Sequence, residues 1–372
     1  MKKLLTSCYF IVLFIITINY SNYSQISSGG IPHTYSPNCT PSIKNKIIPI
    51  INMPQIDTNH LLFQDSLQLT DTTIKEETFN FGYSIPVNLG LNNSGIWDTL
   101  DDGSLIWRLK IKSIGAYDIL LVFNQFWLPQ GAILYIYNED KSALIGGFTE
   151  QNNKPYNRFS AGPIQGESIV LEYYEPANVA QHGNINVAAV IHVYKNIFHK
   201  SHIITSFGLS GKCNINVRCP EGDGWCNQRR SVARYTGGGF VCSGALVTNE
   251  KRDLRPYFLT ANHCVEDEQV GDWLFIFNYQ SSDCANPIME PATTFSISGA
   301  TLRARRSGSD FALLELTRRP PGDYNTFLAG WSNKNIRPLN AVGIHHPSGD
   351  IKKISVEDDR PDREKFGDRK SV

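Results

Sequence analysis

The sequence predicts an all-β protein in which a β-sandwich is followed by a second β-rich unit. Leu105, Trp107, Leu109 and Ile111 alternate with basic residues, which is the period-two pattern of a half-buried strand. Further short apolar runs are separated by Gly- and Pro-containing turns between residues 79 and 198. Such runs return after residue 239, now among many Gly and Cys residues.

Composition sets the class of protein. The chain has 372 residues, enough for two or three domains, and 41% of them are apolar, which is too many for a disordered chain. The 35 Lys and Arg balance 35 Asp and Glu. A nucleic-acid partner is not expected, because binding phosphates requires a basic face. No apolar run reaches 18 residues, so no membrane span is expected either.

Residues 1–24 have the pattern of a secretory signal peptide. Lys2 and Lys3 precede an apolar run at 9–18, and small and polar residues follow. A buried strand or a membrane anchor is the alternative, but the run is short for an anchor. We therefore expect a secreted protein, extracellular or periplasmic, in which disulfides can form.

Residues 25–78 are rich in Pro, Ser, Thr and Asn with weak periodicity, which predicts a leader or linker. Cys39 has no obvious partner there. Residues 79–198 are predicted to form the β-sandwich, with His182 and His192 on strands or turns and not on a metal. The strands expected besides the one at 105–111 are 117–123, 132–137, 168–173 and 184–194.

Residues 199–356 form the second unit. Six of the eight Cys lie between Cys213 and Cys284, and glycines gather at 236–239. The strands expected there are 240–248, 257–260, 273–279, 311–316 and 341–345. Residues 357–372 are different, because 11 of the 14 residues from 357 to 370 are charged. That stretch predicts a disordered charged tail.

Two motifs in the second unit carry chemistry. Residues 239–247 (GFVCSGALV) are followed by residues 257–264 (YFLTANHC). This pair resembles the trypsin-like serine peptidases, in which the His is the general base and a bridge between the two Cys lies behind it. The resemblance implies that His263 is the base and that Cys242 bonds Cys264. A cross-link beside the base limits the motion of its ring. The plain alternative is a structural His next to an ordinary bridge.

Asp310 is the candidate that orients the base. It lies 47 residues after His263, in the run SDFALLEL at 309–316, so an apolar strand would hold its carboxylate beneath the imidazole. Such an Asp fixes the His tautomer and stabilises imidazolium. Asp272 and Asp283 are rivals, and Asp310 could also be a simple turn residue.

Further motifs narrow the resemblance to the bacterial lysyl endopeptidases, with dense matches from Gly211 to Ser355. They are the stretches KCNINVRCPEGD, FNYQ, AGW and IHHP. The resemblance implies the first β-barrel of a chymotrypsin-like two-barrel fold, preceded by a β-sandwich propeptide. It also implies Lys specificity. His345 and His346 are adjacent on a predicted strand and point to opposite faces, so they are expected to be structural.

The nucleophile of that family is missing. It should lie in a Gly-Asp-Ser-Gly or Gly-Ser-Ser-Gly turn, which also supplies the oxyanion hole, and the sequence contains neither. The stretch from Gly211 to Glu357 is too short for two barrels. We therefore expect a second barrel that is largely missing, a reading frame interrupted after residue 356, and a chain that is inactive as written. A natural short form is the rival interpretation.

Seven cysteines follow the predicted signal peptide, so at least one thiol has no internal partner. The family resemblance suggests a Cys219–Cys284 bridge and would pair Cys213 with a Cys nearer the missing C-terminus. Cys226 departs from the family pattern, and it stays unassigned together with Cys39.

The sequence thus predicts a secreted serine endopeptidase precursor, acting on proteins or peptides and carrying its propeptide in cis. A secreted, non-catalytic binding protein built on a degenerate barrel is the alternative. A metal site formed by His263, His345 and His346 is disfavoured, because no acidic or Cys spacing supports it. We expect neither a cofactor nor a metal.

Overall fold

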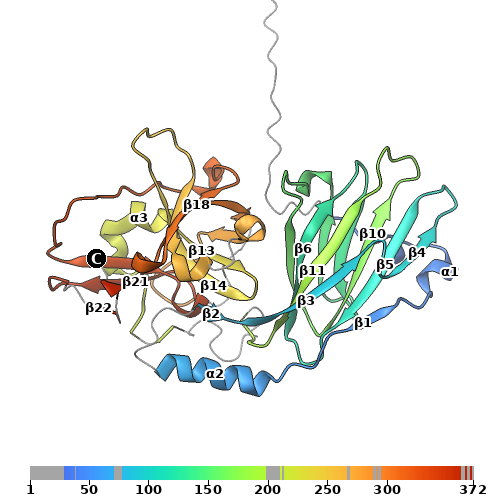
Figure 1. Cartoon of the computed structure of the whole chain (residues 1–372), viewed down its shortest axis with the longest axis horizontal. Coiled ribbons are helices and arrows are strands. Elements are labelled where there is room, and N and C mark those ends of the chain that lie inside the picture. The colour runs from blue at the N-terminus through green and yellow to red at the C-terminus, as the bar shows by residue number, and fades with distance from the viewer. Residues whose placement is uncertain are drawn as a thin grey trace, which may run out of the picture.

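Two β-rich units lie side by side in the computed structural model (Figure 1). The structure describes residues 29–37, 39–70, 78–197, 210–211, 213–265, 269–287, 291, 295–361, 365–366 and 369–370. The predicted signal peptide lies outside the described residues. None of the described helices is long and apolar enough to cross a membrane. The prediction of an all-β chain is confirmed.

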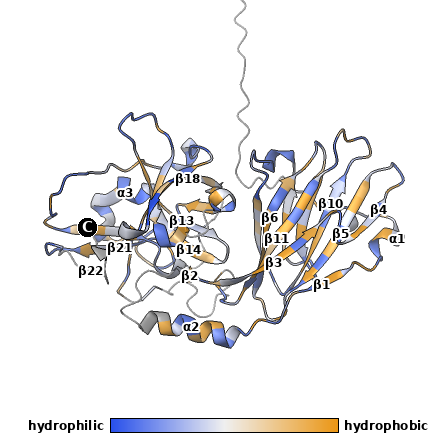
Figure 2. Cartoon of the chain, viewed as in Figure 1, coloured by the Kyte–Doolittle hydropathy of each residue, from blue (hydrophilic) through white to orange (hydrophobic). Residues whose placement is uncertain are grey.

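The first unit, called the sandwich below, is formed by two sheets that enclose one apolar core. One sheet has the order β1-β5-β10-β7-β8, with β4 added to β5, and the other has the order β3-β11-β6-β9. Figure 2 shows apolar residues concentrated on the strands. The strands are β1 (Ile50–Asn52), β3 (Gly82–Gly90), β4 (Ile96–Thr99), β5 (Leu105–Lys112), β6 (Asp118–Trp127), β7 (Ile133–Asn138), β8 (Leu144–Phe148), β9 (Phe159–Gln165), β10 (Ser168–Glu175) and β11 (Asn184–Val193).

Strand β5 is covered on both faces, and not only on the face that the alternation predicts. Trp107 points into the core as expected, but Arg108 is also buried, with its side chain 1% exposed. Its guanidinium lies 2.7 Å from the Asp98 carboxylate on β4. The reason is that residues before β1 lie over this face: the hydroxyl and amide of Thr34 donate to the buried Glu172 of β10.

The interpretation of residues 25–78 as a leader or linker is therefore corrected. Part of this segment belongs to the sandwich, because β1 pairs in parallel with β5, and Cys39 and Ile43 are buried. Backbone pairing between segments far apart in sequence produces no local pattern that a single sequence could reveal. The helices here are η1 (His33–Tyr35), α1 (Pro41–Lys44) and α2 (Thr58–Thr70), and η2 (Glu150–Asn152) lies later in the sandwich.

The second unit, called the barrel unit below, is a curled sheet of order β17-β16-β13-β14-β15-β19-β18. Its core is aromatic, and Tyr235 stacks on Trp273 and Phe275. Strand β2 (Phe79–Asn80) lies in sequence between β1 and β3 of the sandwich, yet it pairs with β14. The other strands are β13 (Val232–Gly237), β14 (Phe240–Val247), β15 (Tyr257–Ala261), β16 (Leu274–Phe277), β17 (Ser296–Ser298), β18 (Ala300–Arg306) and β19 (Phe311–Leu316).

A smaller sheet of order β12-β21-β20 completes the barrel unit. Its strands are β12 (Ile215–Asn216), β20 (Ala341–His345) and β21 (Lys353–Glu357). The helices of the barrel unit are η3 (Pro220–Trp225), α3 (Cys226–Ser231), η4 (Asn262–Val265), η5 (Val270–Asp272), η6 (Ser307–Ser309), η7 (Gly322–Tyr324) and η8 (Pro347–Gly349).

The structure describes residues 357–361, 365–366 and 369–370 of the tail that was predicted to be disordered. Strands β22 (Lys365–Phe366) and β23 (Arg369–Lys370) pair with each other. The Arg337 guanidinium donates to the carbonyls of Arg360 and Pro361, which holds the start of the tail. Backbone hydrogen bonds of this kind do not require apolar side chains, so composition alone could not predict them.

The buried pair on β4 and β5 generates a stability prediction. Asp98→Ala leaves the Arg108 charge buried without its partner, so the free energy of unfolding should fall by about 3–5 kcal/mol. Urea denaturation of the purified chain measures this change. Lys46→Ala is the matched control, because Lys46 also binds Asp98 but is 39% exposed, and it should cost less than about 1 kcal/mol. Equal losses for the two variants would contradict the prediction.

Candidate active site

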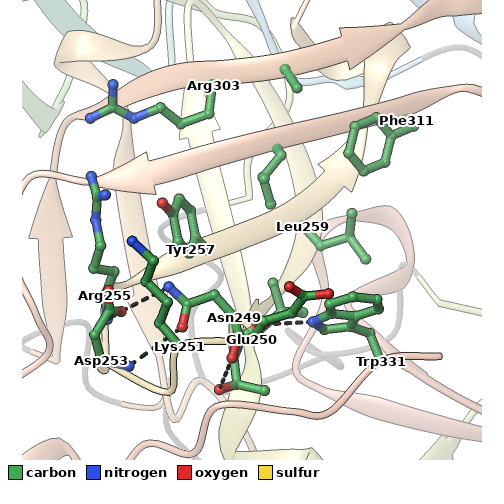
Figure 3. Close-up of a pocket in the computed structure, with 14 residues that line it drawn as sticks. Asn249, Glu250, Lys251, Asp253, Arg255, Tyr257, Leu259, Arg303, Phe311 and Trp331 are labelled. Atoms are coloured by element: carbon green, nitrogen blue, oxygen red, sulfur yellow. Dashed lines mark hydrogen bonds between the residues drawn. The ribbon is translucent and has the colours of Figure 1, made fainter. Parts of the chain in front are cut away.

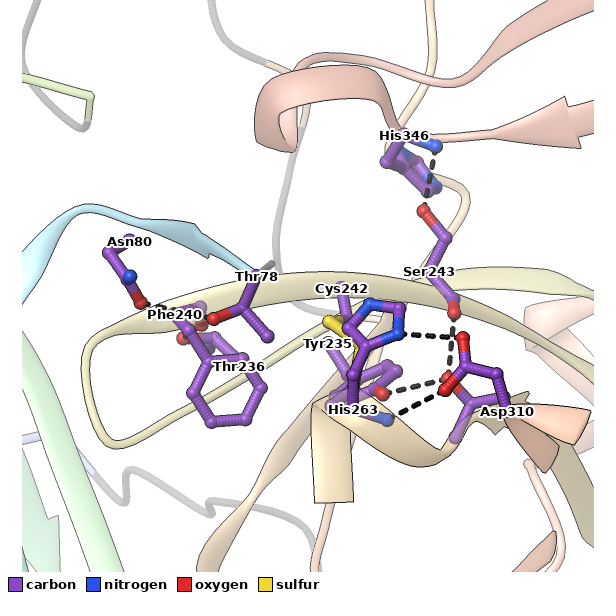
Figure 4. Close-up of a disulfide and its surroundings, with 12 residues drawn as sticks. Thr78, Asn80, Tyr235, Thr236, Phe240, Cys242, Ser243, His263, Asp310 and His346 are labelled. Carbon is purple, nitrogen blue, oxygen red and sulfur yellow. Dashed lines mark hydrogen bonds and ion pairs between the residues drawn. A yellow bond between two sulfur atoms is a disulfide. The ribbon is translucent and has the colours of Figure 1, made fainter. Parts of the chain in front are cut away.

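Strands β14 and β15 bring the two motifs together. They pair antiparallel, with Ala245 opposite Leu259, so the chain after β15 runs back alongside Cys242. Helix η4 then turns away from the sheet and carries His263 and Cys264. Cys264 is bonded to Cys242, so the turn that holds the imidazole is cross-linked to the neighbouring strand (Figure 4).

Asp310 holds His263 at two points. Its Oδ1 accepts the backbone N–H of His263 at 2.9 Å, and its Oδ2 lies 2.7 Å from Nδ1 of the ring (Figure 4). The Asp310 carbonyl also accepts the N–H of Asn262 at 3.0 Å. The residue is left-handed, with a φ of 48°, and lies between η6 and β19. Backbone and carboxylate together therefore fix the position of the ring.

The contact with Asp310 determines which nitrogen of the His263 ring carries the proton. A carboxylate only accepts hydrogen bonds, so Nδ1 must carry the proton, and the lone pair is left on Nε2. A half-buried imidazole in this tautomer can accept a proton from a nucleophile, and the nearby carboxylate then stabilises the resulting charge. The structure brings Asp310 to His263, and it places the two rival acids elsewhere. Asp272 binds Arg158 of the sandwich, and Asp283 accepts the N–H of Ala285.

A hydrogen-bond chain that the sequence did not reveal supports the two strands behind the ring. The Tyr235 hydroxyl lies 2.7 Å from Thr260 Oγ1, which in turn donates to the carbonyl of Ser243 at 2.9 Å. The Ser243 hydroxyl accepts the N–H of His346 at 2.8 Å. These contacts link β13, β14 and β15 to the smaller sheet. The feature of the sequence that could have indicated these hydrogen bonds is Thr260, a polar residue at an inward-facing position of β15.

Among the described residues, no Ser hydroxyl hydrogen-bonds to Nε2 of His263. His345 and His346 do not join the site either. Nδ1 of His346 donates to the Asp350 carbonyl at 2.9 Å, and burial lowers the pKa of His346 well below its ordinary value. In the part of the chain that the structure describes, one metal-sized group of side chains occurs, formed by Cys242, His263 and Cys264. Both cysteines of this group form the disulfide, so neither has a thiol that could bind a metal.

The other cysteines fall into two groups. Cys219 bonds Cys284, so the bridge suggested by the resemblance is present in the structure, and it ties the segment after β12 to the loop after β16. The Asn216 amide donates to the Cys284 carbonyl beside it. Cys39, Cys213 and Cys226 are free thiols in the described structure, the first buried and the other two exposed.

A groove of about 640 Å³ lies on the outer face of β15, β18 and β19 (Figure 3). Leu259, Phe311 and Trp331 line it, and Arg255 and Arg303 lie at the other end, both bound to Glu315. Phe311 follows Asp310 directly, so the groove begins next to the residue that orients His263. A groove this apolar, with Trp331 52% exposed, can accept an apolar segment.

The double contact of Asp310 predicts the tautomer of His263. In Asp310→Asn, the amide oxygen stays on the backbone N–H of His263, so the NH₂ group faces Nδ1. Nδ1 must then accept, and the proton moves to Nε2. Nitrogen chemical shifts of the His263 ring should therefore report protonated Nδ1 in the parent chain and protonated Nε2 in the variant. Protonated Nδ1 in both proteins would contradict the proposed geometry.

The buried His346 predicts loss of stability in acid. Its pKa is lowered by burial and by the nearby Lys352, so the unfolded chain binds the proton more readily. Its contribution is complete above pH 6.5 and is lost as the pH falls below that value. His346→Asn keeps a donor for Asp350, and the unfolding free energy should fall less steeply between pH 6.5 and 5. His60→Asn, on the exposed side of α2, is the control. An unchanged slope in His346→Asn would contradict the prediction.

Comparison with known proteins agrees with the motifs. Residues 207–372 match the family model of the lysyl endopeptidase C-terminal domain, a range that includes the charged tail. The chain is 29% identical over 280 residues to a lysyl endopeptidase of Pseudomonas aeruginosa, an alignment covering 70% of this chain and 59% of that protein. The match therefore spans less than two thirds of the relative's length. The resemblance predicted from the motifs is confirmed: residues 207–372 are similar to the C-terminal domain of lysyl endopeptidases, and the chain as a whole is similar to a lysyl endopeptidase.

Proposed function

We propose that this chain carries the general base and its orienting acid for a secreted serine endopeptidase, in precursor form. His263 is the base and Asp310 the orienting residue. The observation that carries the proposal is the double contact of the Asp310 carboxylate with the backbone and ring of His263. The match of residues 207–372 to the lysyl endopeptidase domain supports it.

In this mechanism a Ser hydroxyl would donate to Nε2 of His263 and attack the scissile carbonyl as the ring takes its proton. The same ring would return the proton to the leaving amine, and Asp310 would stabilise the charge in between. The sequence holds no Gly-Asp-Ser-Gly or Gly-Ser-Ser-Gly turn. We therefore expect these 372 residues, by themselves, to hydrolyse no peptide.

Three finer points belong to the same proposal. Export through residues 1–24 is supported by two disulfides in the structure, which form in oxidising compartments. Lys specificity is supported by the name of the relative. A role for the sandwich as a propeptide in cis is supported by its contacts with the barrel unit. A barrel-like sheet with many non-local pairings folds slowly, and a folded neighbour can help it.

A second candidate is a secreted binding protein without catalysis. The observation that favours it is the groove next to Phe311, whose apolar wall is open to solvent. In that case His263 and Asp310 would be relics, and the groove would bind the apolar segment of a partner protein. The two candidates differ in one property, which is hydrolysis that depends on His263.

The test compares the 372-residue chain with the protein purified from its native source, using fluorogenic Lys, Arg and Leu peptide amides. The native protein should cleave the Lys amide, and His263→Ala should lower kcat by about 10⁴-fold or more. His182→Ala, an exposed His of the sandwich, is the control and should keep full activity. The 372-residue chain should show no turnover.

Two results would contradict the proposal. If the native protein cleaved none of the amides, the binding function would be favoured. Turnover that survived His263→Ala would exclude His263 as the base.

A further inference from the structure

A cavity of about 290 Å³ lies in the sandwich, well before His263 in the sequence, and the sequence motifs assign it no role. Its outer wall is formed by residues 34–35 and 44–48, which precede β1. Its inner wall is formed by side chains of β5, β7 and β10. Sites for small molecules measure roughly 300–1,000 Å³, so this cavity, called the lysine cavity below, has room for a small ligand.

Positive side chains dominate the lining of the lysine cavity. Five of its side chains are cationic, whereas Glu139 is the only carboxylate among the described residues that line it. Like charges gathered around one cavity repel each other unless an anion lies between them. The five cations are Lys44, Lys46, Arg108, Lys110 and Lys141.

Three of the five cations already have a carboxylate partner. Lys46 and Arg108 share the carboxylate of Asp98, at 2.6 and 2.7 Å, and Lys110 binds Glu139. The other two, Lys44 and Lys141, form no ion pair with any residue that the structure describes. Nζ of Lys141 lies 4.5 Å from the centre of the Tyr35 ring, at the edge of the cavity. Positive charge therefore remains available to a ligand.

Two further carboxylates lie near the lysine cavity but are not part of its lining. The buried Glu172 accepts hydrogen bonds from Thr34 and from the hydroxyl of Tyr137. The exposed Asp140 accepts the amide and the hydroxyl of Ser142. Both have hydrogen-bond partners of their own, and neither supplies an acceptor inside the cavity.

Two buried donors line the cavity without an acceptor. Arg108 is 1% exposed, and its Nε has no hydrogen-bond partner among the described residues, although its other end binds Asp98. The Tyr35 hydroxyl is buried and equally unpaired in the described structure. Burial raises the pKa of Tyr35, so the hydroxyl keeps the proton that it would donate. Buried donors without acceptors are rare because each loses its hydration without compensation.

These groups determine which ligand would be complementary to the cavity. All of them are cations or hydrogen-bond donors, so the ligand must be an anion that offers acceptors. They come from three segments, namely the chain before β1, strand β5 and the turn after β7. A phosphate group carries acceptor oxygens in several directions and up to two negative charges, whereas a carboxylate has two oxygens in one plane. Phosphate is therefore the better match.

The mouth of the cavity is apolar. Ile47 and Ile50 line it and are 88% and 47% exposed. Exposed apolar side chains beside lysines are typical of surfaces that contact the headgroups of anionic lipids. They can also pack against the apolar part of a free phosphorylated molecule. Both sources present the same phosphate group to the donors inside.

We propose that the lysine cavity is a phosphate-binding site. Nε of Arg108 and the hydroxyl of Tyr35 donate to the phosphate oxygens, and Lys44 and Lys141 supply the positive charge at the edge. The phosphate belongs either to a free molecule or to a lipid headgroup, and the experiment below separates these sources. The site uses no residue of the peptidase motifs, so it does not depend on the proposed function.

Calorimetric titration of the full chain with inorganic phosphate, at constant ionic strength, measures the affinity. One phosphate should bind per chain, with a Kd of about 1 mM or lower. The double variant Lys44→Gln, Lys141→Gln removes the two cations that lack a carboxylate and should raise the Kd about tenfold or more. Lys334→Gln makes the same change at an exposed lysine of the barrel unit and should leave the Kd unchanged.

Tyr35→Phe tests the buried donor and separates binding from folding. The ring keeps its packing against Tyr137, and only the hydroxyl is lost. Because this hydroxyl has no partner in the described structure, its removal should leave the unfolding free energy without phosphate unchanged or higher. The Kd for phosphate should rise about fivefold or more. A lower stability together with an unchanged Kd would assign the hydroxyl a structural role and contradict the proposal.

Sedimentation with lipid vesicles identifies the source of the phosphate. If the headgroup is the ligand, the chain should sediment with phosphatidylglycerol vesicles, and inorganic phosphate and Tyr35→Phe should each weaken that binding. If the ligand is a free molecule, phosphate should bind while the vesicles do not. No binding of inorganic phosphate up to about 10 mM would overturn the proposal. So would a Kd that is the same in the parent, the double lysine variant and Tyr35→Phe.

Discussion

Strand β14 is the constraint on which the rest of the barrel unit depends. One of its edges is paired with β13, and the other is shared by β15 and by β2. Between these two partners lies Cys242, which is bonded to the residue after His263. A displacement of β14 would therefore move the turn that holds the base, the aromatic core beneath it and the contact with the sandwich. The candidate site and the contact with the sandwich therefore share one strand.

Several buried charges are covered by segments from outside their own sheet, and each has an oppositely charged or polar partner. Arg108 and Glu172 are both buried because residues before β1 cover them, and each finds a partner there or on β4. Asp272 is buried because the sandwich covers it, and Arg158 supplies the counter-charge. In each case the buried charge would be destabilising without its partner. It therefore favours the arrangement of the chain that brings the partner to it. Asp310 differs from Asp272 in burial, because its carboxylate stays partly exposed beside His263.

The sequence predicted what local patterns determine. The strand at 311–316, the pairing of the two motifs and the candidates His263 and Asp310 all came from short stretches of residues. Contacts between distant segments were not predictable: β1 beside β5, β2 beside β14, and Thr34 on Glu172. The pairing of β22 with β23 in the tail was not predictable for a related reason, because it depends on backbone hydrogen bonds, which a charged composition does not prevent.

The central claim is that strand β2, which lies between β1 and β3 in the sequence, completes the sheet that holds the base. Amide hydrogen exchange of the full chain, followed by mass spectrometry, tests it most directly. The account predicts that peptides covering 79–82 and 239–242 exchange slowly and with the same opening free energy, as parts of one cooperative sheet. Rapid exchange at 79–82 while the remainder of β14 stays protected would contradict it, since β2 would then not be part of the sheet in solution.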